Sequence, residues 1–135
     1  MRTPSQTVGP FFAIGLCRDA EHELDPAGVE LTGRLLDGRD DPIPDGLVEV
    51  FDADSGRWGR CGTDAEGRFR FLVPRTARRL EAYVFGRGLL RHQLTRIYLD
   101  GGGAEDEALV ARREGERFLF DIRVQGEQET VFFDV

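Results

Sequence analysis

Residues 29 to 38 read VELTGRLLDG, and this stretch decides the class of fold. Apolar and polar side chains alternate from Val29 to Leu35, and Asp37 and Gly38 then supply a turn signal. Alternation with a period of two is typical of a strand that buries one face. The stretch therefore predicts a half-buried β-strand that ends in a turn.

The same kind of pattern recurs along the whole chain. Further strands are predicted at residues 46–54, 67–74, 80–86, 94–100, 118–124 and 130–135. Prolines, Gly-rich stretches or charged breaks separate them, as expected for turns. Short strands at this spacing indicate a β-sandwich or barrel, and we expect an all-β protein, an antiparallel sandwich of about seven to eight strands.

The apolar positions of these strands also predict which side chains fill the core. The expected core residues are Leu31, Leu35, Val48, Val50, Phe69, Phe71, Ala82, Val84, Ile97, Leu99, Phe118, Phe120, Ile122 and Phe132.

One stretch departs from the β pattern. Residues 104–115 read AEDEALVARREG, with acidic side chains first, arginines last and Gly115 beyond them. This order complements a helix dipole, and a glycine commonly follows a helix C-terminus. A single short helix is expected here.

The N-terminal stretch TPSQTVGPFF, residues 3–12, fits neither a helix nor a paired strand. Pro4 and Pro10 fix the backbone φ angle and remove two hydrogen-bond donors. We therefore divide the chain into an extended arm, residues 1–20, and one sandwich domain, residues 21–135.

Composition excludes several classes of protein. The chain has 135 residues and a net charge of −7, whereas a general nucleic-acid binder needs a basic face. It shows no signal-peptide pattern and no apolar run near the ~20 residues that span a bilayer. Cys17 and Cys61 lack disulfide-framework or metal-site spacing, which favours reduced thiols and a cytoplasmic location and leaves one bridge open.

Motifs that would carry chemistry are missing from the sequence. His22 and His92 form no metal-binding pattern, and Ser5 and Ser55 lie in turn-like sequence without a nucleophile motif. The GRG at residues 86–88 opens no helix and is interpreted as part of a hairpin turn. The residues alone therefore indicate a binding or assembly module.

Four ordered stretches nevertheless resemble a known family. The arm TPSQTVGPFF, LVEVFDAD at 47–54, GRGLLRHQLTRIYLD at 86–100 and FLFDIRVQGEQETVFFDV at 118–135 are similar to α subunits of the intradiol ring-cleavage dioxygenase family that act on protocatechuate. The resemblance spans Thr3 to Val135, although the chain is short for this family. It implies a β-sandwich that works with a homologous, iron-binding β subunit.

The resemblance also implies that this chain does not hold the iron. In the family, the β subunit binds Fe(III) through two tyrosines and a His-x-His pair, and the histidine positions fall here on Arg79 and Glu81. Arginine has no lone pair to donate to a metal. The loop that would carry a ligand tyrosine is reduced to SGRWGRCGTD, residues 55–64, and Tyr83 and Tyr98 are interpreted as packing residues. No metal ligand and no catalytic residue are expected in this chain.

By the same resemblance, the α chain helps to form the substrate pocket at the α–β contact. Thr7, Gly9 and Pro10 of the arm and Arg87 are the residues it implicates, with Arg87 near the substrate's carboxylate. The implied reaction converts protocatechuate and O2 to 3-carboxy-cis,cis-muconate, in a larger hetero-oligomer. An iron-free sandwich that kept the family fold as a binding or scaffold protein remains the alternative.

Overall fold

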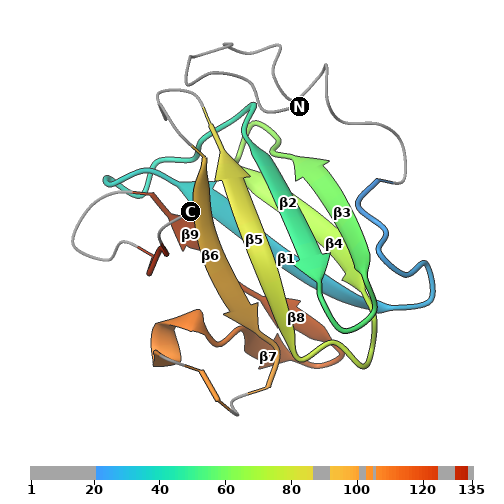
Figure 1. Cartoon of the computed structure of the whole chain (residues 1–135). Helices are drawn as coiled ribbons and strands as arrows, with labels where there is room; N and C mark the ends of the chain where they lie inside the picture. The colour runs from blue at the N-terminus through green and yellow to red at the C-terminus, as the bar shows by residue number, and fades with distance from the viewer. Residues whose placement is uncertain (1–20, 87–91, 101–102, 105, 125–129, 134–135) are drawn as a thin grey trace.

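The computed structural model describes residues 21–86, 92–100, 103–104, 106–124 and 130–133. Within these residues two sheets pack face to face, with the four-stranded sheet in front in Figure 1. The expected all-β sandwich is confirmed. The front sheet has the order β3 (Arg57–Gly62), β2 (Leu47–Asp52), β5 (Arg79–Phe85), β6 (Gln93–Tyr98).

The second sheet has five strands and lies behind the first in Figure 1. Its order is β4 (Arg68–Val73), β1 (Val29–Leu36), β8 (Arg117–Leu119), β7 (Arg112–Glu114), and β9 (Ile122–Arg123) pairs with the far end of β1. All pairs of the front sheet are antiparallel, whereas β1 pairs in parallel with both β8 and β9. The two sheets therefore share a core but are built differently.

The short parallel strands β8 and β9 are two halves of one predicted strand. Asp121 separates them, and its Oδ1 accepts a hydrogen bond from the backbone N–H of Arg34 at 3.0 Å. Just before it, the Phe120 N–H donates to the Thr32 carbonyl at 2.9 Å. Gly33 is required here, because a Cβ at that position would lie 1.8 Å from the Phe120 carbonyl oxygen.

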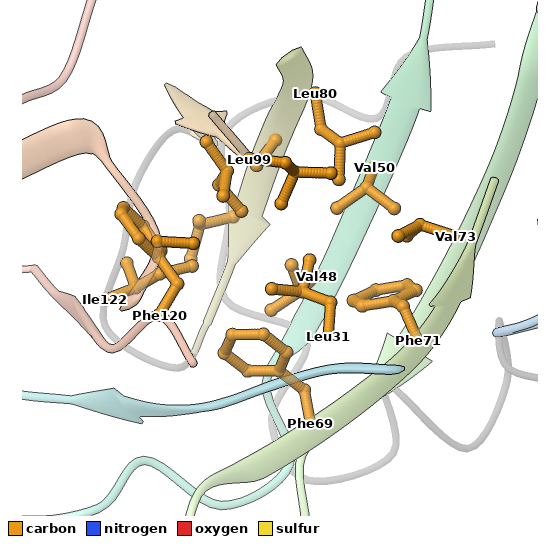
Figure 2. Packing of buried hydrophobic residues seen from close by; sticks show 14 of the residues in the cluster. Leu31, Val48, Val50, Phe69, Phe71, Val73, Leu80, Leu99, Phe120 and Ile122 are labelled. Atoms are coloured by element: carbon orange, nitrogen blue, oxygen red, sulfur yellow. The ribbon is translucent and has the colours of Figure 1, made fainter. Parts of the chain in front are cut away.

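The core lies between the sheets and matches the predicted core closely. In Figure 2, Phe69, Phe71 and Leu31 meet Val48 and Val50 of the opposite sheet. Twelve of the expected core residues are buried, and the other two, Phe118 and Phe132, are partly buried and pack against the rest. Leu24, Val73, Leu80 and Val124 add to this cluster.

Three local predictions were wrong. Residues 104–115 do not form the expected helix: Glu107–Leu109 make a single 3-10 turn capped by Asp106, and Arg112–Glu114 form β7. Gly115, at φ 63°, belongs to the turn between β7 and β8 and does not end a helix. Residues 55–64 contain strand β3, which we had interpreted as a loop. The strand expected at 130–135 is limited, within the described residues, to a bridge between Leu94 and Phe133.

The predicted arm, residues 1–20, lies outside the described residues. Within those residues, no helix has the length and apolar character that a membrane span requires.

Candidate functional site

The outer face of the front sheet carries the positions that the family resemblance singled out. On β5, Leu80, Ala82 and Val84 point into the core, so that Arg79, Glu81 and Tyr83 project to the other side. We call this outer side of β3-β2-β5-β6 the site face.

Strand register brings two rows of side chains together across the site face. The first row runs through Trp58, Phe51, Glu81 and Arg96. The second runs through Arg60, Glu49, Tyr83 and Leu94. Residues directly opposite each other on neighbouring strands lie close enough to contact, so each row is a continuous strip.

Ion pairs occupy Arg79 and Glu81, the two positions on which the family resemblance places the histidine ligands. Glu81 Oε1 lies 3.4 Å from Arg79 Nε, and Glu81 Oε2 lies 3.2 Å from Arg96 Nε. The Arg96 guanidinium also lies over the Phe133 ring, 4.3 Å from its centroid. A guanidinium cannot ligate a metal, and the Glu81 carboxylate already has two cationic partners. This donor set does not fit a ferric ion.

Among the described residues, no group of three or more histidine, cysteine, aspartate or glutamate side chains is placed to hold a metal ion. Tyr83 and Tyr98 lie on the site face and contribute to packing there. Tyr98 is buried where the segment after the 3-10 turn crosses it, and its carbonyl accepts from the Ala111 N–H at 2.8 Å.

A second charged cluster lies at the β3 edge of the site face. Arg60 lies between two carboxylates, with 3.4 Å from Nε to Glu21 Oε2 and 3.4 Å from Nη2 to Glu49 Oε1. Its guanidinium also lies 4.9 Å from the ring centroid of Trp58. Arg60 therefore joins the residues before β1, strand β2 and the exposed indole in one cluster.

Aromatic rings gather at the end of β5 that leads toward Arg87. The His92 ring lies 5.6 Å from that of Tyr83 and 5.2 Å from that of Phe85, measured between centroids. His92, which forms no metal-binding pattern in the sequence, packs with these two rings. Arg87 lies in the sequence between the end of β5 and the start of β6. Arg87, Thr7, Gly9 and Pro10 all lie outside the described residues, so their roles stay predictions.

A cavity of about 490 Å³ opens at the opposite end of β5, beside Arg79. Arg78, Tyr98, Asp54 and Asp100 also line it. Two arginines and two aspartates give this lining no net formal charge. The cavity therefore offers no clear preference for an anion or a cation.

The other candidate residues have structural partners. Ser55 Oγ donates to Asp52 Oδ2 at 2.7 Å, as expected for a turn residue. His22 Nε2 lies 3.3 Å from Arg70 Nη1. Cys61 is a free cysteine, and burial raises the pKa of its thiol, which disfavours the reactive thiolate.

Two residues of the site face were missed by the sequence reasoning. Phe51 and Trp58 are the large hydrophobic side chains that stay exposed among the described residues, at 38% and 52% of their area. The sequence carries a weak signal for them, because Trp58 and Arg60 alternate with the small residues Gly59 and Cys61. Large and small side chains thus alternate with the period of a strand, but the inner positions carry no large apolar side chain.

Comparisons with known sequences identify close relatives over the full span of the chain. No protein-family model matches it. The protocatechuate 3,4-dioxygenase alpha chain of Burkholderia cepacia is 31% identical over 192 aligned positions, covering 99% of this chain and 98% of the relative. The alpha chain from Pseudomonas putida is 30% identical over 192 positions, with 98% and 96% covered. Because 192 positions exceed the 135 residues of this chain, both relatives carry internal segments that it lacks.

Two further comparisons concern a related subunit and the fold. A protocatechuate 3,4-dioxygenase beta chain of Burkholderia cepacia is 37% identical over 79 residues, 43% of this chain and 34% of that relative. The dioxygenase domain of a dioxygenase carbohydrate-binding fusion from Streptomyces sp. SirexAA-E superposes with a TM-score of 0.63 at 23% identity, over 93% of this chain and 99% of that one. Catechol 1,2-dioxygenase from Pseudomonas arvilla C-1 gives 0.58 at 22% identity, over 79% and 56%. At these identities the structures share the fold.

Proposed function

This chain belongs to the family of protocatechuate 3,4-dioxygenase alpha chains, within the intradiol dioxygenases, and from that membership we propose that it acts as the subunit that shapes the substrate pocket while a partner holds the iron. The family resemblance of its four sequence stretches is thereby confirmed. The enzyme proposed is an α–β complex that cleaves protocatechuate with O2 to 3-carboxy-cis,cis-muconate. The oxidative chemistry would come from the Fe(III) bound to the partner, a homologous β subunit.

One observation supports the assignment of the iron to the partner subunit. Glu81 lies between Arg79 and Arg96, with N···O distances of 3.4 and 3.2 Å, and Arg79 and Glu81 are the positions on which the family resemblance places the histidines of the iron-binding subunit. Converting these side chains into metal ligands would require breaking both ion pairs, and the arginines still could not coordinate. We therefore assign the metal to the β subunit and derive no step at a metal in this chain.

The proposed contribution of this chain is recognition of the substrate. Protocatechuate carries a carboxylate, and a guanidinium can bind it through charge-assisted hydrogen bonds. Arg87 is the residue assigned to this role, and Thr7, Gly9 and Pro10 of the arm are proposed to wall the pocket. Glycine and proline in the arm would allow its backbone to approach a flat aromatic ring without a bulky side chain.

Co-expression with an intradiol β subunit tests the proposed function. The expected product is a stable α–β complex that carries iron and opens protocatechuate between its hydroxyl-bearing carbons, measured by O2 uptake and product absorbance. The isolated α chain should bind no stoichiometric iron. A β subunit that is equally active without this chain, or stoichiometric iron in the chain alone, would remove the proposal.

Arg87→Ala in the assembled complex tests the substrate role by itself. Loss of one charge-assisted interaction, on the order of 1.5 to 3 kcal/mol, should raise KM roughly 10- to 100-fold with the iron content unchanged. Arg112→Ala, an exposed truncation on β7, serves as the control and should leave KM unchanged. An unaltered KM in Arg87→Ala would take Arg87 out of the pocket.

A further inference from the structure

Three aromatic rings pack together at the end of the site face that leads toward Arg87. The His92 ring lies against those of Tyr83 and Phe85, with centroids 5.6 and 5.2 Å away and ring planes tilted by 51° and 30°. All three residues are partly buried. Tilted aromatic pairs at such distances attract each other beyond the effect of the area they bury. We call Tyr83, Phe85 and His92 the ring cluster.

Two of the three rings belong to a strand that is paired on both sides. β5 lies between β2 and β6 (Figure 1), and Tyr83 pairs in register with both neighbours. Phe85 is opposite Leu47 of β2. Side chains on such a strand are held more precisely than side chains on loops. The two rings of β5 therefore form a fixed surface against which His92 packs.

The ring cluster continues the contact between β5 and β6 beyond their hydrogen-bonded ladder. Among the described residues, that ladder ends at the Val84–Gln93 pair. Phe85 and His92 come next on the two sides, and their rings meet at 5.2 Å. Six residues join Phe85 to His92 in the sequence, and Arg87 is the second of them. The ring cluster therefore holds together the two ends of the connection that contains Arg87.

We propose that His92 is a positioning residue for Arg87, an inference that rests on the proposed function. His92 acts through its packing against Tyr83 and Phe85, which restricts the orientations open to the Arg87 guanidinium. An arginine that is ordered before the substrate arrives loses less entropy when it binds a carboxylate. The bonds between a planar guanidinium and a carboxylate also depend on their relative orientation. Without the ring cluster, Arg87 would bind the substrate's carboxylate less tightly.

His92→Ala in the assembled α–β complex tests this inference. Loss of both ring contacts should raise KM for protocatechuate roughly 3- to 10-fold, with kcat and iron content unchanged, because the variant affects substrate binding alone. His92→Phe keeps a planar ring at this position and should restore most of the wild-type KM. His22→Ala, a histidine truncation beside Arg70 of the other sheet, is the matched control and should leave KM unchanged.

A double variant separates a positioning role from a general loss of stability. If His92 acts through Arg87, His92→Ala should have no further effect on KM once Arg87 is also changed to alanine. Phe85→Leu removes one ring contact while His92 stays in place, and it should raise KM in the same direction. This variant tests the inference even if His92→Ala does not assemble. Thermal unfolding of each complex checks that the fold and the assembly are retained.

The outcomes separate this inference from the function on which it rests. If Arg87→Ala raises KM but His92→Ala and Phe85→Leu do not, the inference is wrong and the proposed function stands. Effects of His92→Ala and Arg87→Ala that simply add would overturn it too. A His92→Phe variant as impaired as His92→Ala would also overturn it, because the imidazole itself would then be required. A chain that forms no active complex with any intradiol β subunit would remove both the inference and the proposed function.

Discussion

The two outer faces of the sandwich follow the same alternation of inward and outward residues but carry different side chains. On the site face, Phe51, Trp58 and Tyr83 lie among charges that are paired across strands. The outer side of the five-stranded sheet, which we call the arginine face, instead presents Arg34, Arg68, Arg70 and Arg112 around Thr32 and Leu119. Both faces follow the same alternation, so the inward pattern alone determines the fold and the outward residues are free to differ.

The difference extends to the way the charges are held. On the arginine face, Arg68 lies 3.0 Å from Asp64, but its side chain is 62% exposed. On the site face, the Glu81 side chain is only 19% exposed between its two arginines. Exposed pairs are screened by water and contribute little to stability, whereas partly buried ones are costly to break. The comparison indicates that the Glu81 ion pairs on the site face are better shielded from water than the Arg68–Asp64 pair on the arginine face.

Gly33→Ala should destabilise the five-stranded sheet, and its loss of stability should be the largest of those predicted. The added methyl would lie 1.8 Å from the Phe120 carbonyl oxygen and 2.7 Å from the Phe69 ring. The Phe120 backbone cannot move away without loss of the β1–β8 pairing. We therefore expect the free energy of unfolding to fall by about 3 kcal/mol or more, measured by urea denaturation.

Gly115→Ala is the matched glycine control for this prediction. It lies at φ 63° with open space around its missing Cβ. Its cost should be limited to backbone strain, about 1 kcal/mol. Equal losses of stability in the two variants would show that the close approach of Phe120 to Gly33 is not the reason why residue 33 must be glycine.

Arg60→Ala tests whether the paired charges of the site face stabilise the fold more than an exposed charge of the arginine face does. It removes the cation shared by Glu21 and Glu49 and leaves two half-buried carboxylates facing each other. We expect a loss of about 1 to 3 kcal/mol in the free energy of unfolding, because hydrogen bonds to charged groups are the stronger ones. Arg112→Ala on the arginine face should change it by no more than about 0.5 kcal/mol. Similar losses in both variants would contradict the difference we draw between the faces.

The inward side of the fold could be predicted because its signal is local. Leu31, Phe71, Val48 and Val84 each sit at an alternating apolar position, and each is buried. β3 could not be found in this way, because its inner positions are Gly59 and Cys61. A Cβ at Gly59 would lie 2.6 Å from Leu24 Cδ1 and 2.7 Å from the Glu21 carbonyl oxygen, so the contact that selects glycine comes from a distant segment.

The predicted helix failed for a related reason. Acidic residues before Leu109 and arginines after it satisfy helix-dipole rules, but Leu109 and Ala111 are buried at a spacing of two while Arg112 and Arg113 are exposed. Pairing of β7 with β8 stabilises the extended form, and this pairing is set by tertiary structure. On the site face, the positions Arg79 and Glu81 came from the family resemblance, whereas the pairing of Glu81 with Arg96 needed the β5–β6 register.

Asp64→Asn tests an exposed ion pair of the arginine face, where a small effect is expected. Asp64 Oδ1 accepts from the Arg68 and Glu66 N–H groups at 2.9 and 3.0 Å, and Oδ2 lies 3.0 Å from Arg68 Nε. The backbone hydrogen bond from Arg68, followed by the Arg68 side chain, lowers the pKa of this carboxyl below its usual value. Asparagine keeps an acceptor for the backbone N–H groups, but it removes the charge and replaces Oδ2, the acceptor for Arg68 Nε, with an NH2 group. Because the pKa is lower in the folded state, the carboxylate stabilises the protein above about pH 4, and this contribution disappears as the pH falls through the folded-state value. The free energy of unfolding should therefore differ by less than about 1 kcal/mol at pH 7, because the pair is screened by water, and by still less near pH 3. Urea denaturation of both proteins across this range measures the difference, and a difference that stays constant with pH would show that Asp64 acts through its hydrogen bonds and not through its charge.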